Sequence, residues 1–131
     1  MRYRYMMNCN EKGVRGLIKV IDDLQEKGFY SFPAFDDHSP IDIIAVDRLG
    51  NSYRLQVKYK GEGYGLSAVT VVNGKKLPIN RNMIDGWAVY LAKHKKVVYL
   101  NVRLLEGKKS CTIDPSKDYG ELDNWKRTSA G

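Results

Sequence analysis

The sequence of 131 residues predicts a mixed α/β (α+β) fold with a central mixed β-sheet. Three observations predict it: one helical stripe of apolar residues near the N-terminus, alternation of apolar and polar residues further along, and turn signals between the alternating runs. There is no internal repeat, low-complexity tract or Ser/Pro-rich linker, so we expect residues 1–131 to form a single domain. With 43% hydrophobic residues, the chain can bury a core.

The first element is a helix over Glu11–Lys27, with Asn8 or Asn10 available to cap its start. Its apolar residues recur at i, i+3, i+4, i+7 and i+10 on one face, namely Val14, Leu17, Ile18, Ile21 and Leu24. Gly13 and Gly16 are unusual here, because each costs about 1 kcal/mol relative to Ala within a helix. They indicate close packing against a strand or, alternatively, close approach of a phosphate backbone.

Strand-like runs follow, each bounded by turn residues. The predicted strands are 29–35, 41–47, 52–60, 66–72, 86–91 and 97–105. The turn at 48–51 joins the second and third of these as a hairpin, and Asn73-Gly74 marks another turn. Residues 75–82 read as a basic loop, 83–85 as a short helical turn, and the polar tail from Asp114 as a loop with a short docked helix.

The chain is basic, with 22 Lys and Arg against 15 Asp and Glu, a formal net charge of +7 and a pI near 9.4. This charge favours a polyanionic partner, and nucleic acid before a membrane, because no basic amphipathic helix stands out. No apolar run approaches the roughly 20 residues needed to span a bilayer, and a secretory signal is not recognisable, so we expect a cytoplasmic protein. Cys9 and Cys111 provide neither a disulfide framework nor a metal cluster.

The residues most suggestive of chemistry lie around the predicted hairpin. Asp42 is a carboxylate at the start of an apolar strand, which is costly unless the charge is paired, hydrogen-bonded or bound to a cation. Gln56 and Lys58 are two residues apart on the partner strand, so they share one face, which lies beside Asp42 if the pairing register allows it. The Val57 carbonyl lies between them. Such an oxygen set suits Mg²⁺, which keeps several waters and takes one or two carboxylates.

Simpler explanations stay open for these residues. Asp42 could cap backbone groups or pair with Lys58, and the face carrying Gln56 and Lys58 could be a solvated edge, since Arg54 and Lys60 share it. The acidic and histidine residues at 36–38 read as a polar loop rather than a metal cluster.

Pro-Ile-Asp42, followed after 13 residues by Gln56-Val-Lys58, resembles the motif of the PD-(D/E)xK nuclease superfamily. The resemblance is closest to members with Gln in place of the usual acid, which include small homing endonucleases, and it covers roughly residues 11–113. It implies a restriction-endonuclease-like core, with a central mixed sheet flanked by helices. It also implies that Asp42, Gln56 and the Val57 carbonyl coordinate Mg²⁺, with Mn²⁺ able to substitute, and that Lys58 orients or deprotonates the attacking water or stabilises phosphoryl charge.

One departure concerns the acid count. Many members carry a Glu in the first helix, where this chain has Leu17, and Glu11 is the nearest acid upstream. Either Glu11 reaches the site, or metal binding is weak, or the nuclease has become a binding protein.

The resemblance implies a Mg²⁺-dependent endonuclease, of homing or restriction-like type, that hydrolyses double-stranded DNA. A Holliday-junction resolvase and a catalytically inactive nucleic-acid-binding module are the alternatives. A chain with one site cuts two strands as a homodimer or homotetramer. Residues 61–81 are the first candidate for entering a DNA groove, and the candidate DNA-binding residues are Lys60, Lys75, Lys76 and Arg81.

Overall fold

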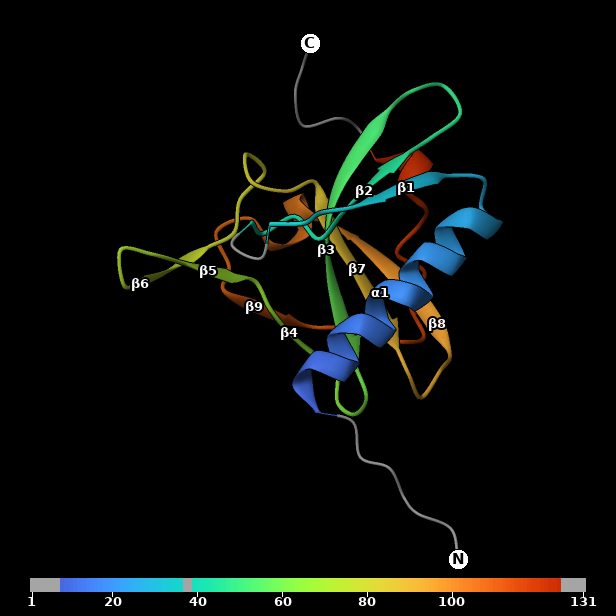
Figure 1. Cartoon of the computed structure of the whole chain (residues 1–131). Coiled ribbons are helices and arrows are strands. Elements are labelled where there is room, and N and C mark those ends of the chain that lie inside the picture. The colour runs from blue at the N-terminus through green and yellow to red at the C-terminus, as the bar shows by residue number, and fades with distance from the viewer. Residues whose placement is uncertain (1–7, 37–38, 126–131) are drawn as a thin grey trace, which may run out of the picture.

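The structure, a computed structural model, describes residues 8–36 and 39–125. At its centre is a five-stranded sheet with the order β1-β2-β3-β7-β8, in which only β3 and β7 are parallel neighbours. These strands span Tyr30–Pro33, Ile43–Val46, Ser52–Lys60, Gly86–Leu91 and Lys96–Asn101. The α1 helix, Cys9–Glu26, crosses one face of the sheet (Figure 1). The predicted mixed fold is therefore confirmed.

The α1 helix begins at Cys9 rather than at the predicted Glu11, and Asn8 is the one of the two candidate caps that is used, because its side chain accepts a hydrogen bond from the Glu11 N–H at 2.9 Å. Gly16 lets the helix approach β3 closely: a Cβ at this position would lie 3.3 Å from the Cβ of Tyr59. Close packing therefore explains Gly16, whereas a Cβ on Gly13 would meet no atom within 4 Å. Among the described residues, no helix is long and apolar enough to cross a bilayer.

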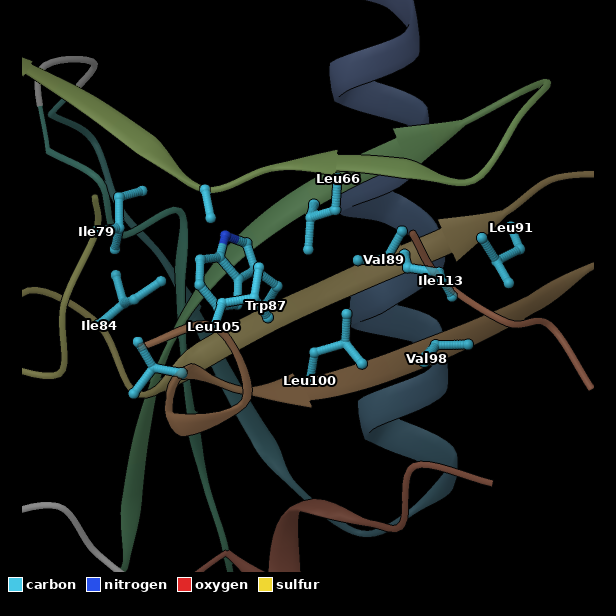
Figure 2. Packing of buried hydrophobic residues seen from close by; sticks show 12 residues of the cluster. Leu66, Ile79, Ile84, Trp87, Val89, Leu91, Val98, Leu100, Leu105 and Ile113 are labelled. Atoms are coloured by element: carbon cyan, nitrogen blue, oxygen red, sulfur yellow. The ribbon is translucent and has the colours of Figure 1, made fainter. Parts of the chain in front are cut away.

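The sheet separates two hydrophobic clusters. On the α1 side, the buried residues are Val20, Leu24, Phe29, Ile43, Ala45, Tyr53, Leu55, Ala88, Tyr99 and Leu122. On the other side they are Leu66, Ala68, Ile79, Ile84, Trp87, Val89, Leu91, Val98, Leu100, Val102, Leu105 and Ile113 (Figure 2). Because each fully buried large apolar side chain contributes about 1.5–3 kcal/mol, both faces of the central strands are stabilised by burial.

The structure differs from the prediction at residues 66–82. The predicted strand 66–72 is divided into β4 and β5, because the Ala68 N–H donates to the Lys109 carbonyl and the Ala68 carbonyl accepts from Ile79. The predicted loop begins instead with β6, which pairs with β5 across the Asn73-Gly74 turn. β4, β5 and β6 span Gly65–Ser67, Val69–Val72 and Lys75–Pro78. The β5–β6 hairpin projects away from the central sheet (Figure 1).

The C-terminal third also departs from the prediction. The strand expected to reach residue 105 ends at Asn101, whose side chain caps the 3₁₀-helix η1, Val102–Leu105, by accepting from Arg103 N–H. β9, Ser110–Thr112, pairs with β4 and was not expected from the sequence. The short helix expected in the tail is η2, Leu122–Asn124.

Candidate functional site

Asp42 stands directly before β2 and is held by three hydrogen bonds. Its N–H donates to the Leu55 carbonyl at 2.9 Å, and its carbonyl accepts from Ala34 N–H at 2.9 Å. Its Oδ2 accepts from the Val57 N–H at 2.7 Å, so the carboxylate reaches across to β3. The backbone-capping interpretation of Asp42 is therefore right for one carboxylate oxygen, and this contact fixes the side chain at the start of the β2–β3 pair.

An unpaired edge of β3 adjoins this carboxylate. β2 pairs with β3 only from Ser52 to Leu55, whereas β3 continues to Lys60. Because the N–H and C=O groups of one strand residue point to the same edge, the Val57 carbonyl faces the edge at which its N–H meets Asp42. The Asp42 carboxylate and the Val57 carbonyl thus border the same unpaired edge of β3.

Gln56 and Lys58 lie on the face of β3 opposite α1, because the alternate residues Val57 and Tyr59 contact Gly16 of the helix. Both side chains are half-buried. The Oε1 atom of Gln56 accepts a hydrogen bond from the indole Nε1 of Trp87 at 3.0 Å. Gln56 and Lys58 therefore share one face of β3 as predicted, and the buried Trp87 hydrogen-bonds to the Gln56 side chain on that face.

The electrostatics also connect Asp42 and Lys58. Burial raises the pKa of the Asp42 carboxyl above its usual value, although the Val57 N–H and the positive charge of Lys58 act in the opposite direction. The two side chains are not among the ion pairs closer than 4 Å in the described part of the chain. The negative charge of Asp42 is thus only partly compensated by protein groups, which favours an added cation beside it.

Glu11 occupies the first turn of α1. Its Oε1 accepts from the Asn8 amide at 3.1 Å, which with the Glu11 N–H bond to Asn8 forms a reciprocal cap. Its Oε2 is buried and has no hydrogen-bond partner. Helical spacing places Glu11 on the face of Ile18, which is 58% exposed, rather than on the face of Gly16 that packs on β3. The contacts of Glu11 are therefore those of a helix cap.

The oxygen donors of Asp42 and of the neighbouring β3 segment are of the types that a magnesium-type ion binds. The Asp42 carboxylate and the Val57 carbonyl share one edge of β3, and the Gln56 amide, whose oxygen accepts from Trp87, is on the adjacent residue; such donors agree with the preference of Mg²⁺ for few protein carboxylates and several waters. Within residues 8–36 and 39–125, no group of three or more His, Cys, Asp or Glu side chains gathers in one place. The cluster considered at 36–38 includes Asp37 and His38, which lie outside the described residues.

The basic residues fall into two groups. Lys60 ends β3 on the face that carries Lys58 and is half-buried. Lys75 and Lys76 are exposed on the β5–β6 hairpin, and Arg81 is exposed in the following turn with its Nε 3.9 Å from Glu106. The hairpin therefore presents a separate basic surface.

Sequence reasoning did not assign a role to two residues of β7 and its approach. Asp85 accepts hydrogen bonds from the Arg54 N–H at 2.7 Å and from its guanidinium at 3.2 and 3.1 Å. Trp87 holds the Gln56 amide. Both contacts depend on the parallel pairing of β3 with β7, 31 residues apart, which no local pattern reveals. A buried indole, which requires an acceptor, was the available signal.

Comparison with known proteins shows that the fold occurs in a solved structure. No protein-family model matches the chain, and no curated protein matches its sequence. The fold is nevertheless a known one: an α+β domain whose central mixed sheet carries the helix on one face. A bacterial homing endonuclease, I-Ssp6803I, has a similar structure, with a TM-score of 0.67 and 14% sequence identity over 95% of this chain and 86% of that chain. The two proteins share a fold.

Proposed function

We propose that the chain is a metal-dependent endonuclease that hydrolyses phosphodiester bonds in double-stranded DNA. The observation that carries the proposal is the meeting of Asp42 with the Gln56-Val57-Lys58 segment of β3, fixed by the 2.7 Å contact between the Asp42 carboxylate and the Val57 N–H. The fold shared with a homing endonuclease supports it. The net charge of +7 supports a polyanionic substrate.

Each residue has a defined task in this proposal. Asp42, Gln56 and the Val57 carbonyl hold Mg²⁺, or Mn²⁺ in its place, and the ion supplies charge neutralisation at the phosphate oxygens and lowers the pKa of water. Lys58 orients the attacking water, accepts its proton or stabilises the charge that grows on the phosphoryl oxygens. Glu11 would add a second carboxylate through its buried Oε2, which has no hydrogen-bond partner, only by leaving the α1 face on which the cap holds it.

DNA contacts are assigned to the two basic groups. Lys60 extends the face of Lys58 and would contact the phosphate next to the scissile bond. The β5–β6 hairpin is a two-stranded ribbon of the kind that the major groove admits, and Lys75, Lys76 and Arg81 would neutralise phosphates along it. Because one chain carries one site, cleavage of both strands requires a homodimer or homotetramer.

The experiment is a nicking assay on supercoiled plasmid with Mg²⁺ or Mn²⁺, comparing the wild type with Asp42→Asn and Lys58→Ala. We expect nicking by the wild type only, with DNA binding retained by all three proteins in a gel-shift assay. A branched junction as a second substrate distinguishes a resolvase, which would cut it in preference to the plasmid.

One alternative has an observation of its own. Among the described residues, Asp42 is the one carboxylate hydrogen-bonded to the Gln56-Val57-Lys58 segment, which favours a binding module that keeps the scaffold without catalysis. Tight, salt-dependent DNA binding with no cleavage in either metal would decide for that module and against the endonuclease.

A further inference from the structure

Trp87 is a buried hydrogen-bond donor at the candidate site. The side chain is 0% exposed and lies in the cluster on the face opposite α1, beside Ile84 and Leu105 (Figure 2). A buried indole N–H has to find an acceptor, and here it donates to Oε1 of Gln56 at 3.0 Å. The contact therefore joins the core of the domain to a side chain of the candidate site.

This bond selects one end of the Gln56 amide. An indole N–H can only donate, so it hydrogen-bonds to the amide oxygen and cannot hydrogen-bond to the amide NH₂. The oxygen has a second lone pair, which leaves it able to bind a cation while it accepts from Trp87. A neutral amide also satisfies the indole without placing a second negative charge beside Asp42.

The strand register holds the donor in place. Gln56 and Trp87 are direct partners in the parallel β3–β7 pair. Just before this pair, the Arg54 N–H donates to the Asp85 carboxylate at 2.7 Å and the Asp85 N–H donates to the Arg54 carbonyl at 2.8 Å. These bonds fix how β7 starts against β3, so Trp87 cannot slide away from Gln56 without breaking them.

We propose that Trp87 is a positioning residue that presets the Gln56 amide oxygen as a neutral metal ligand. The inference rests on the proposed function, because it assumes a divalent ion at Asp42 and Gln56. Without the indole N–H, a half-buried Gln56 presents either end of its amide, and only the oxygen end binds a cation. Gln56 lacks the negative charge of the acid found at this position of the motif, and Trp87 compensates by fixing the direction of the Gln56 amide oxygen.

The test measures Mn²⁺ affinity of the full chain without DNA, from the loss of the free-ion signal in electron paramagnetic resonance. Removing an outer partner of a metal ligand typically weakens metal binding 10–100-fold, so Trp87→Phe should raise the Mn²⁺ Kd at least about tenfold. The matched control is Trp125→Phe, since Trp125 packs against Tyr53 on the α1 face, and its Kd should equal that of the wild type.

A double-mutant cycle separates positioning from packing. In a Gln56→Leu background, Trp87→Phe should change the Kd no further, because the indole acts only through the amide. A wild-type Kd in Trp87→Phe, or a loss that persists in the Gln56→Leu background, overturns the inference. Absence of Mn²⁺ binding by the wild type, or binding that Asp42→Asn leaves intact, overturns the proposed function instead.

A second measurement uses protein that retains Trp87, so it tests the inference even if Trp87→Phe does not fold. The indole N–H resonances of the two tryptophans are assigned with Trp125→Phe. The Trp87 resonance should shift on Mg²⁺ addition, because an ion bound to the Gln56 amide oxygen changes the hydrogen bond that the Trp87 N–H donates to this oxygen. The Trp125 resonance should not shift. An unmoved Trp87 resonance at a Mg²⁺ concentration that saturates the site overturns the inference.

Discussion

Asp42→Asn should separate stability from activity. The substitution keeps an oxygen that can accept the 2.7 Å hydrogen bond from the Val57 N–H, but it removes the negative charge. Burial raises the pKa of the Asp42 carboxyl above its ordinary value of 3.8, so folding favours the protonated form. The contribution of this group to stability is therefore complete below pH 3.8 and is lost as the pH rises through the raised pKa.

The arrangement sets the free energy of unfolding of each variant relative to the wild type. Near pH 7, without metal, Asp42→Asn should be at least as stable as the wild type, and the difference should disappear toward pH 4. Asp42→Ala leaves the Val57 N–H without its acceptor and should cost about 1–3 kcal/mol. Mg²⁺ at ten times its Kd should stabilise the wild type by about 1.4 kcal/mol and should leave Asp42→Asn unchanged.

The assay is urea unfolding of the wild type, Asp42→Asn and Asp42→Ala between pH 4 and 7.5, with and without Mg²⁺, beside the nicking assay. Asp42→Asn should be inactive and fully folded. If it is instead clearly less stable than the wild type at pH 7 without metal, the ionised carboxylate stabilises the fold, and the interpretation of its burial is wrong.

Three further substitutions test the packing and the DNA surface. Gly86→Ala would place a Cβ against the Leu100 carbonyl oxygen and should lower the free energy of unfolding by about 1–3 kcal/mol or more; an unchanged melting temperature would contradict this geometry. Tyr99→Phe loses a 2.6 Å hydrogen bond to an aspartate of α1 and should cost about 1.5–3 kcal/mol in urea unfolding, and a cost near zero would mean that water replaces the bond. Replacing Lys75 and Lys76 together by Ala should weaken DNA binding and reduce the slope of log K against log salt by about 1.8; an unaltered slope would remove the hairpin from the DNA interface.

The sequence predicted best those parts of the fold that local patterns control. β3 and β7 have the expected bounds, because strict alternation and a short apolar run between turns are each compatible with few other structures. The placing of Gln56 and Lys58 on one face follows from the same alternation. The Asn73-Gly74 turn was also expected, although the strand that follows it was not, since its exposed basic residues resemble a loop.

The remaining features depend on partners distant in the chain. β4 and β5 are separate because Ala68 bonds to Lys109, and this contact has no counterpart in the local sequence. The bond between Trp87 and Gln56 likewise exists only because β7 lies parallel to β3. Polar contacts at the candidate site can therefore be predicted from the sequence where one hairpin forms them, as between Asp42 and Val57. They cannot be predicted where strands distant in the chain pair, as between Trp87 and Gln56.

The edge strand β1 limits how copies of this chain can join. The Ala34 N–H points toward Asp42, so by alternation the backbone nitrogen of Pro33 faces the open edge, where proline has no hydrogen to donate. In β1 only Ser31 then offers an outward N–H, on a strand of 4 residues. Such an edge resists growth of the sheet by a strand from another molecule, which also guards against edge-to-edge aggregation. A symmetric assembly that cuts both strands of a duplex would therefore be joined through a surface other than the β1 edge.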